Sequence, residues 1–384
     1  MKQVLLVTNG HGEAAIADRI ADELRALLPD ARFDHLALVG NHADVTMRPV
    51  GPRRPMPSGG LIAMGNARNL FADLRAGLLG LTLEQARFLR QRRGTYDAVV
   101  AVGDAYALAM ALLARSTTVF VGTAKSVEVA PYGPFEARLL ARAQACFVRD
   151  AATAQSLRQR GVEAESANAI VDLVAAPHDP GLESDVAGLV PILALFPGSR
   201  ESAYDDADFL LGVTRELAAR RPTLGAILSV ARGLDANRFA NDAARAGWNV
   251  ERFDNDVVPF VLRDDGRARV FARRGALGPV LAQAVLVLGQ AGTANEAAAA
   301  AGVPVIAFER DRDRKTRWYR ERQRGLLGEA LAVLPAAMEQ AVAGVGEILD
   351  DGERRARMSA AGRARMGRPG GAARIAARIA SLVA

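Results

Sequence analysis

The chain has 384 residues, which at roughly 150 residues per domain predicts two domains. Half of the residues are hydrophobic and 24% are charged, a composition that excludes a disordered or fibrous protein. The formal net charge is +6, but only three of the 49 basic residues are lysine, and this arginine skew beside abundant alanine indicates a GC-rich genome. Because the charge has that simpler origin and aromatic residues make up only 5%, we expect no nucleic-acid partner.

Short apolar runs alternate with longer helical patterns such as Ala14–Leu28 and Ala207–Arg221. Most of the runs are continuously apolar, as in parallel strands that helices cover on both faces. The alternation is typical of doubly wound α/β domains and occurs twice in the chain. The predicted strands are Val4–Val7, Ala98–Val102, Thr118–Val121, Ala145–Val148, Ile192–Phe196, Ala226–Val230, Val285–Leu288 and Val303–Phe308.

The segment Ala175–Pro191, rich in proline, glycine and acidic residues, interrupts this rhythm and predicts a domain boundary. We assign residues 1–176 to an N-terminal domain and residues 190–366 to a C-terminal one. A glycine-rich turn then leads into a last amphipathic helix, Ala372–Val383.

Neither a membrane span nor a metal site is expected. The longest uncharged stretch, Ala276–Asn295, is broken by Gly-Pro and by two further glycines, so it predicts a strand, a turn and a helix start. The first apolar run is too short for a signal peptide, and a cytoplasmic protein is expected. Cys146 is the only cysteine, and none of the four histidines has a partner at HxxxH spacing, so we expect no disulfide, no metal and no cofactor.

The first loop of chemical interest, residues 8–13, reads TNGHGE and joins the first predicted strand to the first helix. Its glycines let a ligand approach the backbone, and the helix N-terminus favours an anion. The spacing is not GxGxxG, which disfavours a nicotinamide-dependent dehydrogenase. A plain strand–helix turn would carry the same glycines, but His11 and Glu13 inside it favour a site.

The second loop, residues 195–200, reads LFPGSR and also follows a predicted strand. Gly198 and Ser199 would expose backbone amides there. The guanidinium of Arg200 can pair with phosphate oxygens through two parallel hydrogen bonds. This combination favours a phosphate site over a simple loop.

The third loop, residues 289–296, reads GQAGTANE and leads into an alanine-rich helix. The amides of Gly292, Thr293 and Ala294 would lie at the positive end of the helix dipole and form a phosphate cradle. Glu296 can accept hydrogen bonds from the two hydroxyls of a ribose. A glutamate in a first turn also compensates the helix dipole, which is the alternative explanation for Glu296.

These loops together resemble those of lipid-A-disaccharide synthase and, more closely, a related group of bacterial proteins known only as synthase-related. The stretches NGHGE (9–13), NLFADLRAG (69–77) and FVGTAKS (120–126) fit the related group, and PGSR (197–200) with GTANE (292–296) fits both. The resemblance covers nearly the whole chain. The synthase itself begins with Gly-Glu-x-Ser-Gly-Asp, so this chain departs from it in the first loop.

The resemblance implies a GT-B fold, in which two Rossmann-like domains face a cleft and the C-terminal helix, 372–384, crosses back to the first domain. It implies a UDP-sugar donor bound by the C-terminal domain and a lipid or lipid-linked acceptor bound by the N-terminal domain. It further implies transfer of a hexose or hexosamine with inversion at the anomeric carbon and without a metal. Gln323 resembles a glutamine that binds the donor sugar in related transferases.

Asp104, in the stretch VGDA (102–105), resembles the synthase aspartate that the family implies to be catalytic. It follows a predicted strand, at the edge where doubly wound sheets bind ligands. Inverting transfer needs a base for the acceptor hydroxyl, and Asp104 is our first candidate. His11, whose ordinary pKa suits the task, is the second, with Glu13 beside it. A helix N-cap is the structural alternative for Asp104.

Two surface features allow contact with a membrane. Arg310–Arg324 holds eight basic residues against three acidic ones, and it is either a solvated helix or a contact for phosphate or anionic lipid. Leu61–Leu89 mixes leucine with arginine, and it either packs in the core or docks on a bilayer surface. We therefore expect association with the inner face of the cytoplasmic membrane as an alternative to a purely cytoplasmic protein.

Two other functions stay open at this point. A UDP-sugar 2-epimerase on the same fold needs additional acids and bases around the sugar, and the sequence does not identify such a set. A non-catalytic protein would bind the nucleotide sugar without turnover.

Overall fold

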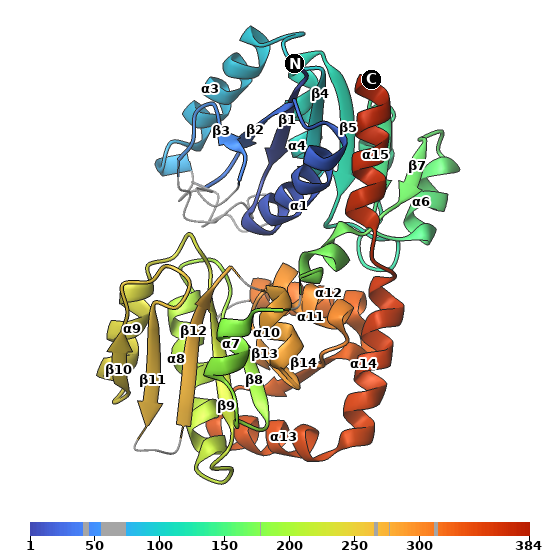
Figure 1. The fold of residues 1–384 in the computed structure, drawn as a ribbon. Coiled ribbons are helices and arrows are strands. Elements are labelled where there is room, and N and C mark those ends of the chain that lie inside the picture. Colours follow the sequence, from blue (N-terminus) through green and yellow to red (C-terminus); the bar gives the residue numbers. More distant parts are fainter. Residues whose placement is uncertain (41–45, 55–73, 177, 265–267, 276, 311–313) are drawn as a thin grey trace. The chain divides into compact units, whose positions relative to one another are not determined.

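The computed structural model describes residues 1–40, 46–54, 74–176, 178–264, 268–275, 277–310 and 314–384. Two compact units make up the fold (Figure 1). Unit 1 contains Met1–Asp172 and Arg368–Ala384, and unit 2 contains Leu173–Gly367. The chain therefore passes between the units twice.

Unit 1 is built on a seven-stranded sheet in the order β3-β2-β1-β4-β5-β6-β7, with every neighbouring pair parallel. Because both faces are covered, the central strands are apolar throughout, as in β4, whose six residues are all buried. The strands are β1 (Gln3–Thr8), β2 (Arg32–Ala37), β3 (Arg48–Pro49), β4 (Ala98–Gly103), β5 (Thr117–Gly122), β6 (Ala145–Val148) and β7 (Ala164–Ser166).

The helices of unit 1 form two layers over this sheet. One core cluster joins the sheet to α3, α4, α5 and α6, while α1 and α15 pack side by side against the other face, as Figure 1 shows. The buried Asp172 carboxylate accepts hydrogen bonds from the backbone N–H groups of Gly370 and Ala372, 2.6 and 2.7 Å away, and so caps α15. The helices are α1 (His11–Leu27), α3 (Leu78–Gln91), α4 (Ala105–Ala111), α5 (Pro134–Leu140), α6 (Ala151–Arg158) and α15 (Gly371–Val383), with 3₁₀ turns at Leu112–Ala114 and Ala169–Val174.

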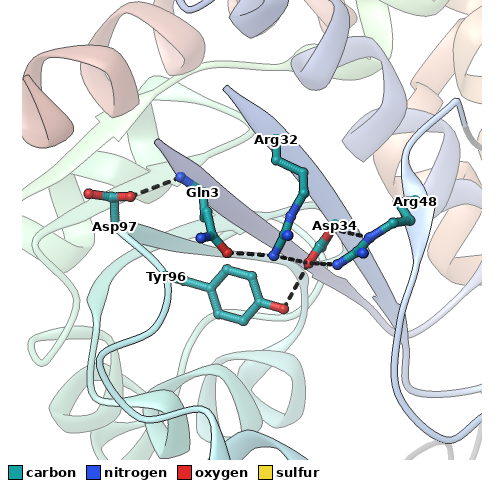
Figure 2. A network of polar contacts seen from close by, with 6 residues as sticks. All are labelled: Gln3, Arg32, Asp34, Arg48, Tyr96 and Asp97. Atoms are coloured by element: carbon teal, nitrogen blue, oxygen red, sulfur yellow. Dashed lines mark hydrogen bonds and ion pairs between the residues drawn. The ribbon is translucent and has the colours of Figure 1, made fainter. Parts of the chain in front are cut away.

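A buried carboxylate joins the first three strands of unit 1 (Figure 2). Asp34 on β2 is fully buried and receives Arg48 from β3 through two contacts of 2.9 and 3.0 Å, with the Tyr96 hydroxyl 3.0 Å away. Arg32 lies 3.4 Å from the same carboxylate and also donates to Gln3 on β1. A two-pronged arginine is the partner that makes a buried carboxylate tolerable.

Unit 2 is built on an eight-stranded sheet in the order β10-β11-β12-β9-β8-β13-β14-β15. Six strands are parallel, and β10 and β11 form an antiparallel extension at one side. The strands are β8 (Ile192–Phe196), β9 (Gly225–Val230), β10 (Asn249–Arg252), β11 (Phe260–Asp264), β12 (Ala268–Arg274), β13 (Leu286–Gly289), β14 (Val305–Glu309) and β15 (Leu331–Pro335).

The helices of unit 2 again cover both faces of its sheet, and α8, α9 and α13 share one core cluster with the strands. Residues 173–189 belong to this unit, because the buried Arg273 on β12 holds Asp179 and Asp185 at 3.5 and 3.0 Å. The helices are α7 (Pro180–Asp185), α8 (Ala203–Ala218), α9 (Ala236–Arg245), α10 (Leu277–Gln283), α11 (Thr293–Ala301), α12 (Arg314–Leu327), α13 (Met338–Asp350) and α14 (Gly352–Met366), with a 3₁₀ turn at Gly328–Ala330.

The predicted fold class, α/β with two doubly wound sheets, is confirmed. All eight predicted strands exist, and β6 and β8 have the predicted bounds. The sequence missed β2, β3, β7, β10, β11, β12 and β15. Six of these are short or contain charged residues, and β15 is an uncharged strand that ends in a proline. No helix in the described ranges is long and apolar enough to cross a membrane.

Candidate functional site

Polar side chains of unit 1 gather where β1, β4 and β5 end. Glycines make room for them: a Cβ at Gly10 would collide with the Glu13 carboxylate, and one at Gly122 would collide with the Tyr132 hydroxyl. The carboxyl ends of parallel strands lie at one edge of the sheet, where doubly wound domains bind ligands. The backbone of this edge is therefore open to the side chains that follow each strand.

Gly103, the last residue of β4, lies between two of these side chains. A Cβ there would collide with the Asn9 amide oxygen and would lie 3.4 Å from Glu13 Cγ. Its φ of +139° is also a conformation that side-chain-bearing residues rarely adopt. Glycine is thus required at this position for both reasons, and Asn9, Glu13 and Asp104 meet around it.

Asp104 caps α4, as the structural alternative predicted. Its Oδ1 accepts hydrogen bonds from the backbone N–H groups of Tyr106 and Ala107, 3.0 and 3.1 Å away. Burial raises the pKa of the Asp104 carboxyl, while the hydrogen bonds from the Ala107 and Tyr106 N–H groups and the nearby Asn9 side chain oppose the rise. A carboxylate with a raised proton affinity is suited to general-base chemistry, so the cap and a catalytic role are compatible.

The other two sequence candidates of unit 1 lie on the first turn of α1. His11 is the first residue of the helix and is half-buried. Glu13 accepts a hydrogen bond from the Thr123 hydroxyl, 3.4 Å from its Oε1, which links the start of α1 to the end of β5. The structure thus brings Glu13 to the same glycine as Asp104.

Two cations and a further acid at this edge were missed by the sequence analysis. Arg149, directly after β6, is 8% exposed and donates to the Thr123 carbonyl at 3.3 Å. Lys125, in the loop after β5, forms an ion pair of 2.7 Å with Glu136 on α5. The signal that could have identified Arg149 is its position directly after a predicted strand; Lys125 and Glu136 carry no comparable local signal.

In unit 2, the two glycine loops predicted to bind phosphate come together. They follow β8 and β13, which are neighbouring strands, and Gln290 N–H donates to the Phe196 carbonyl at 2.8 Å. Gly198 has a φ of +116° and nothing within 4 Å of its Cβ position, so the backbone there is open. The predicted residues Gly198, Ser199 and Arg200 therefore lie beside the start of α11.

Arg200 differs from the other arginines near this edge. Its side chain is half-buried, its Nε is shielded from solvent, and no hydrogen bond or ion pair joins it to another residue in the described part of the chain. By contrast, Arg310 contacts Asp206 at 3.3 Å, and Arg274 donates to the carbonyls of Arg232 and Leu234 at 3.3 and 3.1 Å. Arg200 is thus a shielded cation with unused hydrogen-bond donors.

The loop after β13 begins α11 at Gly292, which has no side chain to cap the helix. Thr293, Ala294 and Glu296 form the first turn, whose leading N–H groups have no intrahelical partner. A Cβ at Gly292 would collide with the Tyr319 hydroxyl of α12. The predicted phosphate cradle and ribose residue are therefore adjacent, with a tyrosine over the cradle.

Gln323 of α12 is buried behind the loop between β13 and α11 and holds its backbone, so its side chain does not line an open surface. It is 6% exposed, its Nε2 donates to the Ala291 carbonyl at 2.9 Å, and its Oε1 accepts from Asn295 at 3.4 Å. Arg320 likewise holds Gln290 through a contact of 3.1 Å. These bonds fix the loop in front of α11; a contact of Gln323 with a donor sugar stays a prediction.

The two predicted surface features are described only in part. Within Arg310–Arg324, residues 311–313 and the side chains of 314–316 lie outside the described residues, while Trp318 is 43% exposed beside Arg322. Within Leu61–Leu89, residues 61–73 lie outside them, while Leu79 and Leu83 of α3 are 66% and 59% exposed. In the described ranges, no three histidine, cysteine, aspartate or glutamate residues are grouped to hold a metal.

No protein-family model and no curated protein matches the chain. Solved structures do match. A UDP-GlcNAc 2-epimerase from Neisseria meningitidis bound to UDP-GlcNAc is 11% identical, with a TM-score of 0.59 and coverage of 99% of this chain and 98% of that one. The spinosyn rhamnosyltransferase SpnG, complexed with thymidine diphosphate, is 14% identical, with a TM-score of 0.55 and coverage of 95% and 96%.

MurG from Acinetobacter baumannii is 13% identical, with a TM-score of 0.51 and coverage of 99% of both chains. At such low identity these likenesses establish the fold, which is GT-B, over almost the whole chain. Lipid-A-disaccharide synthase is not among the matched structures described here, and the neighbours include both an epimerase and a glycosyltransferase.

Proposed function

We propose that the protein is a UDP-sugar-dependent enzyme and that the diphosphate of the donor binds unit 2 at Arg200. The observation that carries the proposal is the Arg200 guanidinium, shielded at Nε and unpartnered among the described residues. Its loop follows β8, the neighbour of β13, whose own loop leads into the N–H groups at the start of α11. A diphosphate supplies the acceptors that both groups lack. Glu296, in the first turn of α11, is placed to receive the ribose hydroxyls.

We further propose inverting transfer of a hexose or hexosamine, with Asp104 as base. The acceptor hydroxyl gives its proton to the Asp104 carboxylate as its oxygen bonds to the anomeric carbon. The bond from that carbon to the UDP oxygen breaks on the opposite face, and UDP leaves with the electron pair. Arg200 stabilises the departing negative charge, and Glu13, on the helix that His11 begins, comes close to the residue before the base.

A lipid or lipid-linked acceptor is supported by the surface next to Asp104. The Tyr106 hydroxyl, two residues after the base, lies 3.3 Å from the Thr82 hydroxyl on α3. On either side of Thr82, the side chains of Leu79 and Leu83 are largely exposed. A bare apolar stripe beside the base is suited to an acyl or prenyl chain, and it also supports membrane-surface association.

A UDP-sugar 2-epimerase is the second candidate, and one observation favours it. Several acids lie at the edge of unit 1, where Glu13 comes close to Gly103, the residue before Asp104, and Glu136 pairs with Lys125. Incubating UDP-GlcNAc in D₂O without an acceptor separates the candidates. An epimerase incorporates deuterium at C2, a transferase releases UDP slowly by hydrolysis, and a non-catalytic binder does neither.

Binding calorimetry tests the donor assignment. We expect UDP to bind in preference to ADP or NAD, and Arg200→Ala to weaken UDP by roughly 1.5–3 kcal/mol, the range for a charged hydrogen bond. Arg263→Ala is the matched control, because Arg263 lies on β11 of the same unit and pairs with Glu251 at 3.1 Å. Equal UDP affinity in wild type and Arg200→Ala would overturn the assignment.

We also propose that neither binding nor turnover needs a metal or an organic cofactor, because the charge of the leaving diphosphate is met by Arg200 and the α11 N-terminus. EDTA is expected to leave both unchanged. Loss of activity in EDTA that a divalent cation restores contradicts this part of the proposal.

A further inference from the structure

One helix of unit 2, α12, holds the loop between β13 and α11 residue by residue. Arg320 donates to the Gln290 side chain at 3.1 Å. The buried Gln323 donates from its Nε2 to the carbonyl of the next residue, Ala291, at 2.9 Å. A single side chain of α12 therefore fixes the direction of the Ala291 carbonyl.

The bond from Gln323 also sets the direction of an N–H group. The peptide bond between Ala291 and Gly292 is trans, so its C=O and N–H point in opposite directions. Because the carbonyl is turned to Gln323, the Gly292 N–H is turned away from that side chain, at the start of α11. Among the described residues, no backbone carbonyl accepts a hydrogen bond from this N–H. It is left as a donor beside the first N–H groups of the helix.

An earlier peptide bond of the loop has the same geometry, with both of its ends paired. The Gly289 carbonyl accepts a hydrogen bond from Asn295 Nδ2, 3.1 Å away. The N–H of the same peptide unit belongs to Gln290 and donates in the opposite direction, to the Phe196 carbonyl at 2.8 Å. That N–H is used within the protein, whereas none of the described carbonyls serves the Gly292 N–H.

Folding stability alone does not explain the two buried amides behind the loop. Asn295 is fully buried, and its Nδ2 also contacts Gln323 Oε1 at 3.4 Å, so the two amides support each other. The Asn295 Oδ1 has no hydrogen-bond partner among the described residues, which is unfavourable for folding. The chain thus tolerates an unpaired acceptor and keeps both amide donors on the loop carbonyls.

We propose that Gln323 is a positioning residue for the diphosphate. By holding the Ala291 carbonyl, it presents the Gly292 N–H to the ligand and keeps a carbonyl oxygen away from the phosphate oxygens. The inference rests on the proposed function, in which unit 2 binds the diphosphate of the donor. It differs from the role that the family resemblance implies, because Gln323 acts through the loop and does not touch the donor sugar.

Binding calorimetry with UDP and with UDP-GlcNAc tests this role, on proteins shown to be folded by circular dichroism at the temperature used. Gln323→Met keeps the length of the side chain but cannot donate to Ala291. We expect it to weaken both ligands equally, by about 3- to 10-fold, as for the loss of one hydrogen bond. If Gln323→Met folds poorly, Gln323→Asn takes its place, because the shorter amide stays polar but is withdrawn from the carbonyl.

Gln85→Met is the matched control. Gln85 on α3 is also fully buried, and it donates to the carbonyls of Ala37 and Leu38 at 3.2 and 3.1 Å, so it holds a loop of unit 1 in the same manner. We expect both substitutions to lower the Tm and only Gln323→Met to lower the affinity for UDP. An equal loss of affinity in Gln85→Met overturns the inference, because the effect is then one of general stability.

Unchanged UDP affinity in Gln323→Met also overturns the inference. So does a loss confined to UDP-GlcNAc, which would put Gln323 against the donor sugar. Arg200→Ala, measured in the same series, separates these results from the proposed function. If Arg200→Ala loses UDP while Gln323→Met binds it normally, only the inference fails. If the wild type does not bind UDP, the proposed function fails and the inference fails with it.

Discussion

The carboxyl edges of the two sheets are built alike. Each edge has a glycine-rich loop after its first strand. Each also has an asparagine whose side-chain oxygen packs against a glycine, Asn9 against Gly103 in unit 1 and Asn295 against Gly289 in unit 2. Both oxygens are buried and have no hydrogen-bond partner among the described residues. The partners of the two amides differ. Asn295 donates to the Gly289 carbonyl at 3.1 Å and to Gln323 at 3.4 Å, whereas Asn9 lies next to the acid Asp104.

The other functional side chains at the two edges also differ, acidic in unit 1 and basic in unit 2. Unit 1 brings Glu13 to Gly103, the residue before Asp104. Unit 2 has Arg200 in the loop after β8, the neighbour of the strand whose loop begins α11. One scaffold therefore supports two kinds of chemistry, proton transfer and anion binding, and the side chains that the glycines admit decide which. Substitutions in unit 1 should therefore affect proton transfer, and substitutions in unit 2 should affect the binding of UDP.

The largest expected effect is on turnover. Asp104→Asn keeps the cap, because an asparagine oxygen also accepts from helix N–H groups, but it removes the proton acceptor. General-base catalysis typically contributes about 10²–10⁴-fold, so UDP-sugar turnover is expected to fall within that range. His11→Ala is expected to cost less. Asp150→Asn is the matched control: it alters the cap of α6 in the same unit and is expected to keep its activity.

The next largest effect is a loss of folding stability at low pH, which is expected in unit 1 because His35 lies there. His35 on β2 is fully buried 2.9 Å from the Thr8 hydroxyl, and burial, with help from Arg53, lowers its pKa from 6.5 to about 4. The unfolded chain therefore takes up a proton below about pH 6.5 that the folded chain refuses until about pH 4. Unit 1 is expected to lose up to about 3 kcal/mol of stability as the pH falls through that window.

Denaturant unfolding at a series of pH values checks this. Both tryptophans, Trp248 and Trp318, lie in unit 2, so their fluorescence follows that unit while circular dichroism follows both. We expect the circular dichroism to show that unit 1 loses stability as the pH falls. This dependence of stability on pH should be weaker in His35→Gln. It should be the same as in the wild type in His178→Gln, whose side chain is 86% exposed. A wild-type profile as flat as that of His35→Gln would contradict the assignment.

The smallest expected effect is on thermal stability. Because the folded pKa of Asp104 is raised, its charge destabilises unit 1 above that pKa, and the penalty disappears as the pH falls and the acid is protonated. Asp104→Asn is therefore expected to raise the Tm of unit 1 at neutral pH, because the variant carries no charge to bury. Asp150→Asn should not. A lower Tm for Asp104→Asn would make Asp104 a structural cap alone.

The strands that could be predicted from the sequence are those formed by one uninterrupted apolar run. Runs such as Ile192–Phe196 need no other segment to be identified as buried strands. The strand β2 was missed because it contains Asp34 and His35, whose burial depends on Arg48, Tyr96 and Thr8 from other segments. No local pattern shows that a charged residue will find such partners.

The residues of the candidate site also fall into those recognisable from the local sequence and those that depend on contacts between distant segments. Loops that combine glycine with Asp104, Arg200 or Glu296 were found from sequence, because the glycine and the functional residue are adjacent in the chain. Asn9 was part of a predicted loop, but no local pattern shows its contact with Gly103, because the two residues are far apart in the sequence. Arg149 was missed because its contact with Thr123 forms only when β5 and β6 pair.

The central claim is that unit 1 supplies the base and unit 2 binds UDP. Its most direct test is to measure both UDP affinity and UDP-sugar turnover for Asp104→Asn and for Arg200→Ala in the same preparations. We expect Asp104→Asn to bind UDP like the wild type while its turnover collapses, and Arg200→Ala to lose UDP affinity by about 10- to 150-fold, the equivalent of roughly 1.5–3 kcal/mol. Loss of UDP affinity in Asp104→Asn, or unchanged affinity in Arg200→Ala, would show that the two edges do not divide the chemistry in this way.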